Sequence, residues 1–581
     1  GSLLREFSLV VVFSTLMSLF VSFTITPMLA SRFGKIEKLS KDTLWGRLNL
    51  GFEHLIDMLR NSYGRALEVV QRKKRWLLSG ITILIIASFA LIPAGFIGAA
   101  FIPSTDKGEL LVTLELAPSA SIFQTNAVTQ QVEKIILKKP EVKNVFSSVG
   151  FVTGGVTGAG NTANLAELNV TIVDKTQRKE TDEQFGLRLQ RELSVAIPGV
   201  KITAVPAASG AQSPIQIAVK AVDIKDARQV AEAYMQVARK VPGTQFVKLS
   251  VKDPKPQVEI KLDREKMASF GLNAGQVGAA LQNAFSGNDQ SKFKQAGKEY
   301  DILISFKATD RSDINNVRNL PFTNGDGQTF VLSQFADVKE GLGESVLERN
   351  NRLNSITVNA NVAGRPVGTV TAEIKDAAKK LNIPKGVIVE FLGDAKNQGD
   401  AFGSLGLALV TAILLVYLIM VALYESLIYP FVVLFSIPVA VVGALLALAL
   451  SMETLNIFSF IGLIMLLGLV SKNAILIVDF TNQLKEEGRP VEDALIEAGR
   501  ERLRPILMTT LAMILGMLPI ALATGAGAEI KSGMAWVIIG GLTSSMVFTV
   551  FVVPAMYLII EKIKNRFQRS GAPSLKPVGT S

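Results

Sequence analysis

Long apolar runs alternate along this chain with one large polar segment. Seven runs are long enough to cross about 30 Å of hydrocarbon as helices. They cover residues 7–30, 76–98, 402–424, 428–450, 455–481, 505–524 and 533–560. The pattern predicts a membrane protein with seven spans and a soluble insert that lies mainly over 99–401.

The insert shows strand and helix periodicities in a repeated order. In its first half, the predicted strands and helices cover 109–116, 126–139, 142–149, 165–173, 183–197 and 200–207. In its second half, they cover 214–222, 226–240, 258–263, 354–362, 372–381 and 386–393. Both halves follow the βαββαβ order of ferredoxin-like units. The predicted fold class is therefore a seven-span membrane α-helical bundle plus an α+β insert of two such units.

A further subdomain interrupts the second unit. It is predicted over 264–345, where the strand-forming pieces EYDILISFK and QTFVLSQFADV indicate a small mixed fold. The predicted segments in chain order are the first span (1–30), a linker helix (31–75), the second span (76–98) and the first unit (99–210). Then come the first part of the second unit (211–263), the subdomain (264–345), the second part of that unit (346–401), a five-span bundle (402–560) and a tail (561–581).

The linker after the first span has helical periodicity. Apolar residues recur over 52–70 at Leu55, Ile56, Leu59, Tyr63, Ala66, Leu67 and Val70. Because Lys and Arg flank this stretch, we expect an amphipathic helix that lies along the membrane surface and links two bundles. A soluble helix is the alternative interpretation.

Charge fixes the predicted orientation. The net charge is +11, and basic clusters lie next to spans in SRFGK, QRKKRW and EKIKNRFQR. This distribution follows the positive-inside rule, so it indicates membrane orientation rather than nucleic acid binding. Both 31–75 and the tail are expected in the cytoplasm, and the insert on the opposite, outer side of the membrane. The start GSLLREF has no Met and no signal peptide, so we expect Gly1-Ser2 to be an artificial leader on a truncated chain.

Composition limits the chemistry. The chain has no Cys and one His, His54, which excludes disulfides, thiolate metal sites and histidine-rich metal sites. No Ser-His-acid set is recognisable, and nothing selects a pair of catalytic carboxylates. We therefore expect neither an enzyme nor a cofactor or metal site.

One lysine lies inside a predicted span. The stretch 462–480, GLIMLLGLVSKNAILIVDF, carries Lys472, and a cation near the bilayer centre costs about 2.5–3.5 kcal/mol on insertion scales. Asp479 lies two turns away, about 10 Å along the helix, which is too far for contact. The other spans offer no buried acid, and Asn473, Thr509 and Thr510 can only form hydrogen bonds. We interpret Lys472 as part of an ion- or proton-coupling site, with snorkelling to the cytoplasmic interface as the alternative.

A glycine-rich stretch lies in the first unit. Residues 144–161, NVFSSVGFVTGGVTGAGN, lack the Lys-Ser/Thr of a P-loop and do not open a helix, so nucleotide binding is not predicted. Because glycine reaches many backbone conformations, a mobile hairpin that lines a cleft is one interpretation. A disordered hairpin is the other.

Four motifs carry a resemblance to a known family. They are GLVSKNAILIVDF, RLRPILMTTLAMILGMLPIALATGAG, ALYESLIYPFVVLFSIPVAVVGA and FIPSTDKGELLVTLELAPSAS. Together they resemble the resistance-nodulation-division (RND) efflux pumps, particularly the hydrophobe and amphiphile exporters. The similarity runs through nearly the whole chain but covers only the C-terminal half of a family member, from its sixth span onward.

The resemblance implies a homotrimeric, proton-driven exporter of drugs or amphiphiles in a bacterial inner membrane. Its insert would form periplasmic porter units, with 264–345 as a docking subdomain, and would work with a periplasmic adaptor and an outer-membrane channel. Lys472 resembles the lysine that pairs with two aspartates on the fourth span, and Asn473, Arg502 and Thr509 resemble other members of that proton relay. Those aspartates belong to the missing N-terminal half, so the chain alone should not pump.

The glycine-rich stretch resembles the family's switch loop. Phe151 is its retained aromatic residue, and Thr, Val and Gly replace other aromatic and basic residues. The implied loop residues are Phe151, Gly154, Gly155, Gly158 and Gly160.

A membrane-anchored export-accessory or assembly protein, with porter-like domains and no ion relay, is the alternative function of the chain.

Overall fold

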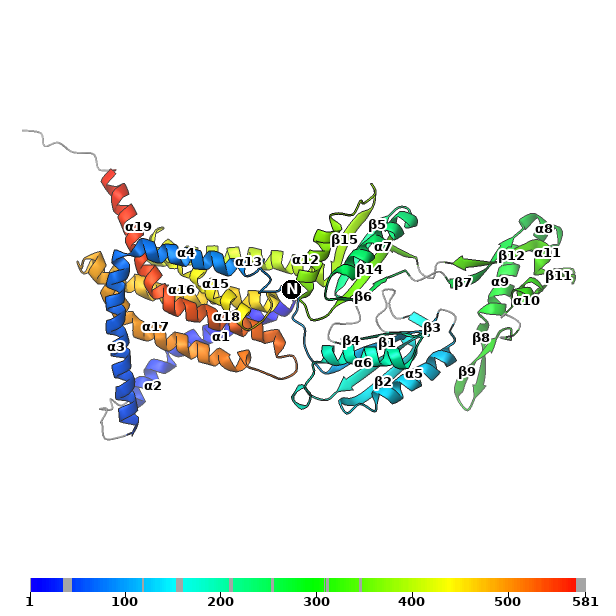
Figure 1. Cartoon of the computed structure of the whole chain (residues 1–581), viewed down its shortest axis with the longest axis horizontal. Coiled ribbons are helices and arrows are strands. Elements are labelled where there is room, and N and C mark those ends of the chain that lie inside the picture. The colour runs from blue at the N-terminus through cyan, green and yellow to red at the C-terminus, as the bar shows by residue number, and fades with distance from the viewer. Residues whose placement is uncertain are drawn as a thin grey trace, which may run out of the picture.

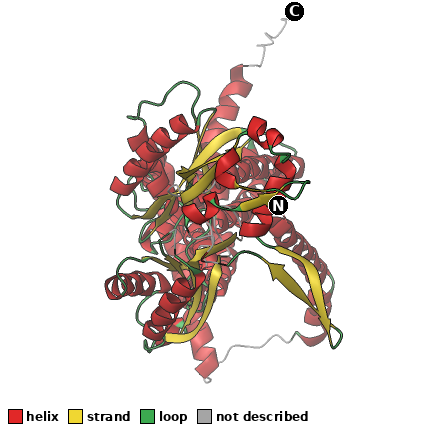
Figure 2. Cartoon of the chain, turned by 90° about the vertical axis from the view of Figure 1, so that its right-hand side faces the viewer, coloured by secondary structure: helices red, strands yellow, loops and turns green. Residues whose placement is uncertain are grey.

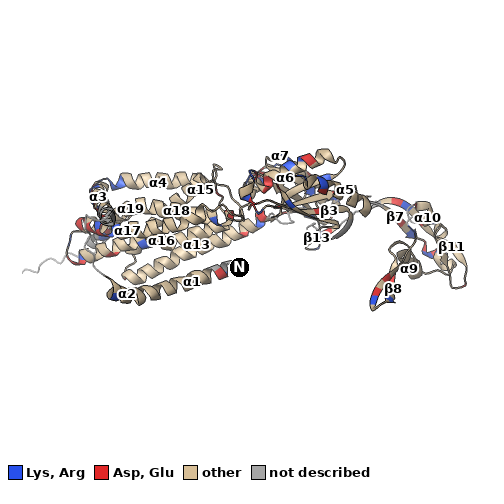
Figure 3. Ribbon diagram, turned by 90° about the horizontal axis from the view of Figure 1, so that it is seen from below, with Lys and Arg blue, Asp and Glu red and all other residues tan. Residues whose placement is uncertain are grey.

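The computed structural model consists of a helical bundle and an elongated α/β region that extends from one end of the bundle (Figure 1). It describes residues 2–34, 44–117, 120–152, 160–207, 213–251, 255–307, 309, 313–343 and 347–570. Charged residues gather at the bundle ends and over the α/β region, and the helices between carry few of them (Figure 3). This division agrees with the predicted membrane bundle and soluble insert.

Among the described residues, six helical segments are long and apolar enough to cross a membrane. They are Ser8–Phe33, Asp394–Tyr424, Tyr429–Leu450, Ile457–Glu486, Val491–Ala521 and Glu529–Lys564. A seventh span over 76–98 is not confirmed at that length, because α4 (Lys74–Ala90) has 17 residues. Beyond it lie Pro93, which lacks a backbone N–H, and Gly95, which adopts φ +82.

Several of the six segments combine two helices. The helices of the bundle are α1 (Ser2–Phe23), α2 (Ile25–Phe33), α3 (Leu44–Arg72), α4, α13 (Asp394–Tyr424), α14 (Tyr429–Leu434), α15 (Ser436–Leu450), α16 (Ile457–Glu486), α17 (Val491–Ala521), α18 (Glu529–Ser544) and α19 (Val550–Ser570). A π-helical turn over Ser545–Thr549 joins α18 to α19.

Glycines permit a close contact between α15 and α18. Helix α18 packs against α15, α16 and α17. A Cβ atom on Gly540 would lie 2.3 Å from the backbone oxygen of Gly443, and a Cβ on Gly443 would lie 2.2 Å from that of Gly540. Small residues let membrane helices approach in this way.

Helix α3 crosses the end of the bundle that is farther from the α/β region (Figure 1). Its residues Ile56, Tyr63 and Leu67 are buried, and the Tyr63 hydroxyl donates to the Val550 carbonyl at 2.7 Å. The predicted amphipathic helix is present, but its predicted apolar face is confirmed only in part, because Leu59 is exposed.

The first α/β unit has the predicted βαββαβ order. Its elements are β1 (Glu109–Glu115), α5 (Ile122–Ile136), β2 (Val142–Val152), β3 (Gly160–Ile172), a 3-10 turn η1 (Lys175–Gln177), α6 (Asp182–Ala196) and β4 (Lys201–Pro206). The sheet is antiparallel, in the order β2-β3-β1-β4. Alternate residues Leu110, Val112 and Leu114 of β1 are fully buried, as period-two strand patterning requires.

The second unit repeats this arrangement. Its elements are β5 (Ile215–Ala221), α7 (Ile224–Lys240), β6 (Thr244–Leu249), β13 (Glu348–Asn350), β14 (Leu353–Val362), α12 (Val367–Ala378) and β15 (Ile388–Gly393). Strand β5 pairs with β15 and β14, and β14 also pairs with β6. Strands β7 (Lys255–Leu262) and β12 (Ala336–Gly343) pair with each other and lead out of the unit.

The inserted subdomain lies beyond this ribbon, farthest from the bundle (Figure 1). Its elements are α8 (Arg264–Ser269), α9 (Ala274–Phe285), β8 (Asn288–Gln295), β9 (Lys298–Ile304), α10 (Ile314–Arg318), β10 (Pro321–Thr323), β11 (Thr329–Val331) and α11 (Leu332–Phe335). The β8–β9 hairpin reaches away from the rest of the chain (Figure 2). Ala296 and Gly297, at its tip, both have positive φ, which matches the right-handed twist of the strands.

Candidate functional site in the membrane bundle

Lys472 lies near the middle of α16. Fifteen residues separate it from the first residue of the helix, Ile457, and fourteen from the last, Glu486, or about 21 Å of helix on either side. Its side chain is exposed. Within the described part of the chain, no carboxylate forms an ion pair with it. The Asp479 carboxylate instead accepts a hydrogen bond from Gln483 at 2.9 Å.

The next residue, Asn473, joins α16 to α17. Its side chain is 1% exposed, and Nδ2 donates to the fully buried Thr510 Oγ1 at 3.3 Å. The Asn473 Oδ1 atom is buried and has no hydrogen-bond partner among the residues that the structure describes. A buried amide oxygen without a partner is costly, so this atom is available to a donor from outside the described residues.

The Thr509 hydroxyl bonds to the backbone of its own helix, α17. It donates to the Pro505 carbonyl at 3.0 Å, a pattern common for Thr inside helices. The structure therefore brings Thr510, not Thr509, to Asn473. The relay role of Thr509 stays a prediction.

Arg502 lies closer to the α3 end of α17. Its guanidinium carbon is 4.5 Å from the centre of the Phe480 ring, a cation–π contact between α17 and α16. The Arg502 Nε atom is buried and has no hydrogen-bond partner in the described part of the chain. Eight residues separate Arg502 from Thr510, about 12 Å along the helix. No hydrogen bond among the described residues joins Arg502 to Lys472 or Asn473. Of the predicted relay residues, Asn473 and Arg502 each make a contact between α16 and α17, but not with each other.

A second charged cluster was not predicted. Lys485 on α16 forms an ion pair with the buried Glu561 of α19, and its Nζ lies 3.5 Å from the Tyr429 hydroxyl. The Tyr557 hydroxyl donates to Asn482 at 2.7 Å. The only signal in the sequence is a single acid, Glu561, at the end of an apolar run and the start of the predicted basic tail. This cluster ties α14, α16 and α19 together near α3.

Part of the predicted switch loop lies outside the described residues, namely Gly154, Gly155 and Gly158. Phe151 ends up on β2, opposite Asn161 of β3, with 43% of its surface exposed. Gly160 begins β3 and pairs with Val152. The ends of the glycine-rich stretch 144–161 therefore belong to the paired strands β2 and β3. The switching role of this stretch stays a prediction.

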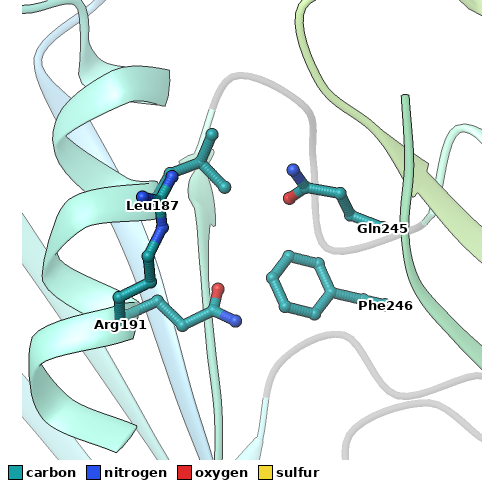
Figure 4. A pocket seen from close by; sticks show the side chains of 5 residues that line it. Leu187, Arg191, Gln245 and Phe246 are labelled. Atoms are coloured by element: carbon teal, nitrogen blue, oxygen red, sulfur yellow. The ribbon is translucent and has the colours of Figure 1, made fainter. Parts of the chain in front are cut away.

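A cavity of about 300 Å³ lies between the two α/β units. Helix α6 supplies Leu187, Gln190 and Arg191, and β6 supplies Gln245 and Phe246. Figure 4 shows the side chains of the two elements facing each other across the cavity. Its lining combines apolar groups, amides and one cation.

The loop between β3 and α6 contacts the bundle. Lys175 Nζ lies 2.5 Å from Glu529 Oε1, at the start of α18. Arg178, almost fully buried, pairs with Asp106 in the segment that leads from α4 to β1.

Burial and the neighbouring Asp106 carboxylate raise the pKa of Asp182 to about 7. Despite burial, the Arg178 guanidinium holds the pKa of Asp106 below its ordinary value.

The comparisons with known proteins agree with this architecture. A sequence model of the AcrB/AcrD/AcrF family matches residues 1–561. Two solved X-ray structures of a heavy metal efflux pump, in crystal forms II and I, are similar at TM-scores of 0.75 and 0.74, each with 25% identity. They cover 87% of this chain, which spans 52% and 53% of theirs. The chain therefore spans about half the length of these proteins.

Proposed function

The chain belongs to the AcrB/AcrD/AcrF family of RND transporters, and we propose that it is the C-terminal half of a proton-driven exporter. The observation that carries this proposal is Lys472, a cation in the middle of α16 without a carboxylate partner among the described residues. Ionisable groups at this depth mark ion pathways in membrane proteins.

In the proposed relay, two aspartates of the N-terminal half neutralise Lys472. Ionised carboxylates attract the ammonium strongly in a low dielectric, and protonation removes that attraction. Lys472 is then released, and α16 shifts relative to the other half. Because Asn473 is hydrogen-bonded to Thr510, α17 moves with α16. Arg502 and Thr509 are the further proposed members of the relay.

We assign α4 as a seventh, short span. Its 17 residues extend about 26 Å as a helix, close to the thickness of the hydrocarbon. The basic ends of α3 and α19 are then cytoplasmic, and the α/β region is periplasmic. An inner-membrane location follows from this orientation.

The proposed N-terminal half would cover an exposed surface of this chain. No residue in the apolar stretch of Ser8–Phe33 is buried, and only 11% of that in Asp394–Tyr424 is. In the assembled protein these helices would contact the N-terminal half and lipid. The two α/β units would serve as porter units of a homotrimer, and the inserted subdomain would dock an adaptor and an outer-membrane channel.

Amphiphilic compounds are the proposed substrates. The cavity between α6 and β6 offers both an apolar ring, Phe246, and a cation, Arg191, a combination that suits amphiphiles. Metal ions are the second candidate, because both similar structures are of a heavy metal efflux pump. A thioether site for a metal needs methionines, and residues 99–401 contain two, Met235 and Met267. These two lie in different hydrophobic cores. Such an arrangement offers no thioether pair for a soft metal.

Complementation in an efflux-deficient bacterium tests this function. The chain and a matching N-terminal half are co-expressed, and growth is measured with cationic dyes, bile salts, silver and zinc. Resistance to dyes and bile salts supports amphiphile export. Resistance to metals alone supports the second candidate, and unchanged growth on all compounds, with both halves inserted, supports the accessory-protein alternative.

A further inference from the structure

The corner between α3 and α4 carries four consecutive cations. Helix α3 ends at Arg72, Lys73 forms the turn, and α4 begins at Lys74, followed by Arg75. Trp76 comes next and is 80% exposed. Since α3 lies across the bundle and α4 runs along it (Figure 1), this corner lies at the proposed cytoplasmic boundary of the membrane.

These four cations have no acidic partner in the part of the chain that the structure describes. Other cations at this end do: Arg60 pairs with Glu501, and Lys485 pairs with Glu561. Adjacent like charges repel one another, so the corner favours an anion from outside the chain.

An exposed apolar stripe continues from the corner along α4. Trp76, Ile83 and Ile86 share one helix face and are 80%, 67% and 65% exposed. Leu77, Leu78 and Ile85, on the opposite side, pack against the bundle core. Trp76 and Ile86 are about 15 Å apart along the axis, half the hydrocarbon thickness of about 30 Å. The stripe therefore has the length of one leaflet.

We propose that this corner is a binding site for an acidic phospholipid of the cytoplasmic leaflet. The headgroup phosphate contacts the four cations, the Trp76 ring lies at headgroup level, and an acyl chain lies against Ile83 and Ile86. The assignment rests on the proposed orientation but not on transport activity. Helix α3 is tied to α17 through Arg60–Glu501 and through Gln71, which donates to the Glu492 carbonyl at 3.2 Å. The bound lipid therefore stabilises the attachment of α3 to a relay helix.

Native mass spectrometry of the purified full chain in neutral detergent tests this site. The protein is titrated with dioleoyl phosphatidylglycerol and, separately, dioleoyl phosphatidylcholine. A basic residue near an acidic surface strengthens binding by about fivefold, so we expect phosphatidylglycerol to bind at least about tenfold more tightly. In the variant Arg72→Gln/Lys73→Gln/Lys74→Gln/Arg75→Gln, that preference should largely disappear.

The matched control removes four exposed cations of the α/β region that also have no ion pair within the described residues: Lys138→Gln, Lys298→Gln, Lys307→Gln and Lys385→Gln. It should retain the preference. Equal binding of the two lipids by the unsubstituted chain, or an unchanged preference in the corner variant, would overturn the proposal.

A second measurement leaves the cations in place and so does not depend on the folding of the corner variant. In a Trp45→Phe/Trp536→Phe background, Trp76 is the remaining tryptophan. Brominated phosphatidylglycerol should quench its fluorescence more than brominated phosphatidylcholine at the same mole fraction. Equal quenching would also overturn the proposal.

Discussion

Lys175 of the first α/β unit and Glu529 of α18 form an ion pair, with Nζ 2.5 Å from Oε1. Glu529 is the first residue of α18, which packs on α16 and α17, the helices of the proposed relay. Lys175 belongs to the loop that follows β3, and β3 begins at Gly160, within the glycine-rich stretch. The pair therefore connects the bundle to a strand that reaches the predicted switch loop.

Charge reversal at this pair should reduce export. Lys175→Glu or Glu529→Lys places like charges together, whereas the double exchange restores opposite charges. Because both side chains are partly exposed, the change in stability should be within about 1 kcal/mol. Export by the completed protein, measured with equal amounts inserted, should fall in each single variant and recover in the double variant. A double variant as impaired as the singles would show that the pairing itself does not matter.

Thr510 should matter for stability and Thr509 should not. Thr510→Val removes the partner of Asn473 Nδ2 in a buried site, which should lower the unfolding free energy by about 1 kcal/mol. Thr509→Val removes only a bond within its own helix and serves as the matched control. Unfolding in detergent gives the two values. Equal losses would contradict the inter-helix role of Thr510.

Gly540 should tolerate no side chain. Gly540→Ala would force its Cβ against the Gly443 backbone oxygen, and such overpacking costs about 1–3 kcal/mol. Gly468 on α16 has nothing within 4 Å of an added Cβ, so Gly468→Ala should be neutral or stabilising. Thermal unfolding of the two variants tests this difference, and similar midpoints would show that α15 and α18 separate easily.

Asp182 should make stability depend on pH. Its pKa is about 7 in the folded chain against an ordinary 3.8, so the folded state binds the proton more tightly. That contribution to stability is complete below about pH 4 and is lost as pH rises through about 7. Asp182→Asn removes it. The difference in unfolding temperature between wild type and Asp182→Asn should therefore change across this range, and a constant difference would mean that Asp182 ionises normally.

Local periodicity predicted the α/β units well because their cores are built from alternating strands and amphipathic helices. Leu110, Val112 and Leu114 of β1 show this pattern, and the order of the elements then specified the topology. The predicted span 76–98 is longer than the observed helix α4, which ends at Ala90. Hydropathy does not register that Pro93 and Gly95 disfavour helix.

The candidate site was harder to predict than the fold. Lys472 stands out in any hydropathy pattern because a charge interrupts an apolar run. Which of Thr509 and Thr510 meets Asn473 depends on the rotation of α17 against α16, and adjacent residues differ by about 100° around a helix. The Lys485–Glu561 pair joins residues far apart in sequence, which no local pattern reveals.

The central claim is the proposal that Lys472 works with carboxylates from an N-terminal half. The most direct measurement is proton-driven export from vesicles that contain the chain alone, the chain with its N-terminal half, or that pair with Lys472→Met. We predict export only by the unsubstituted pair, because Met preserves bulk but removes the charge. Robust export by the chain alone, or by a normally inserted Lys472→Met pair, would contradict the claim.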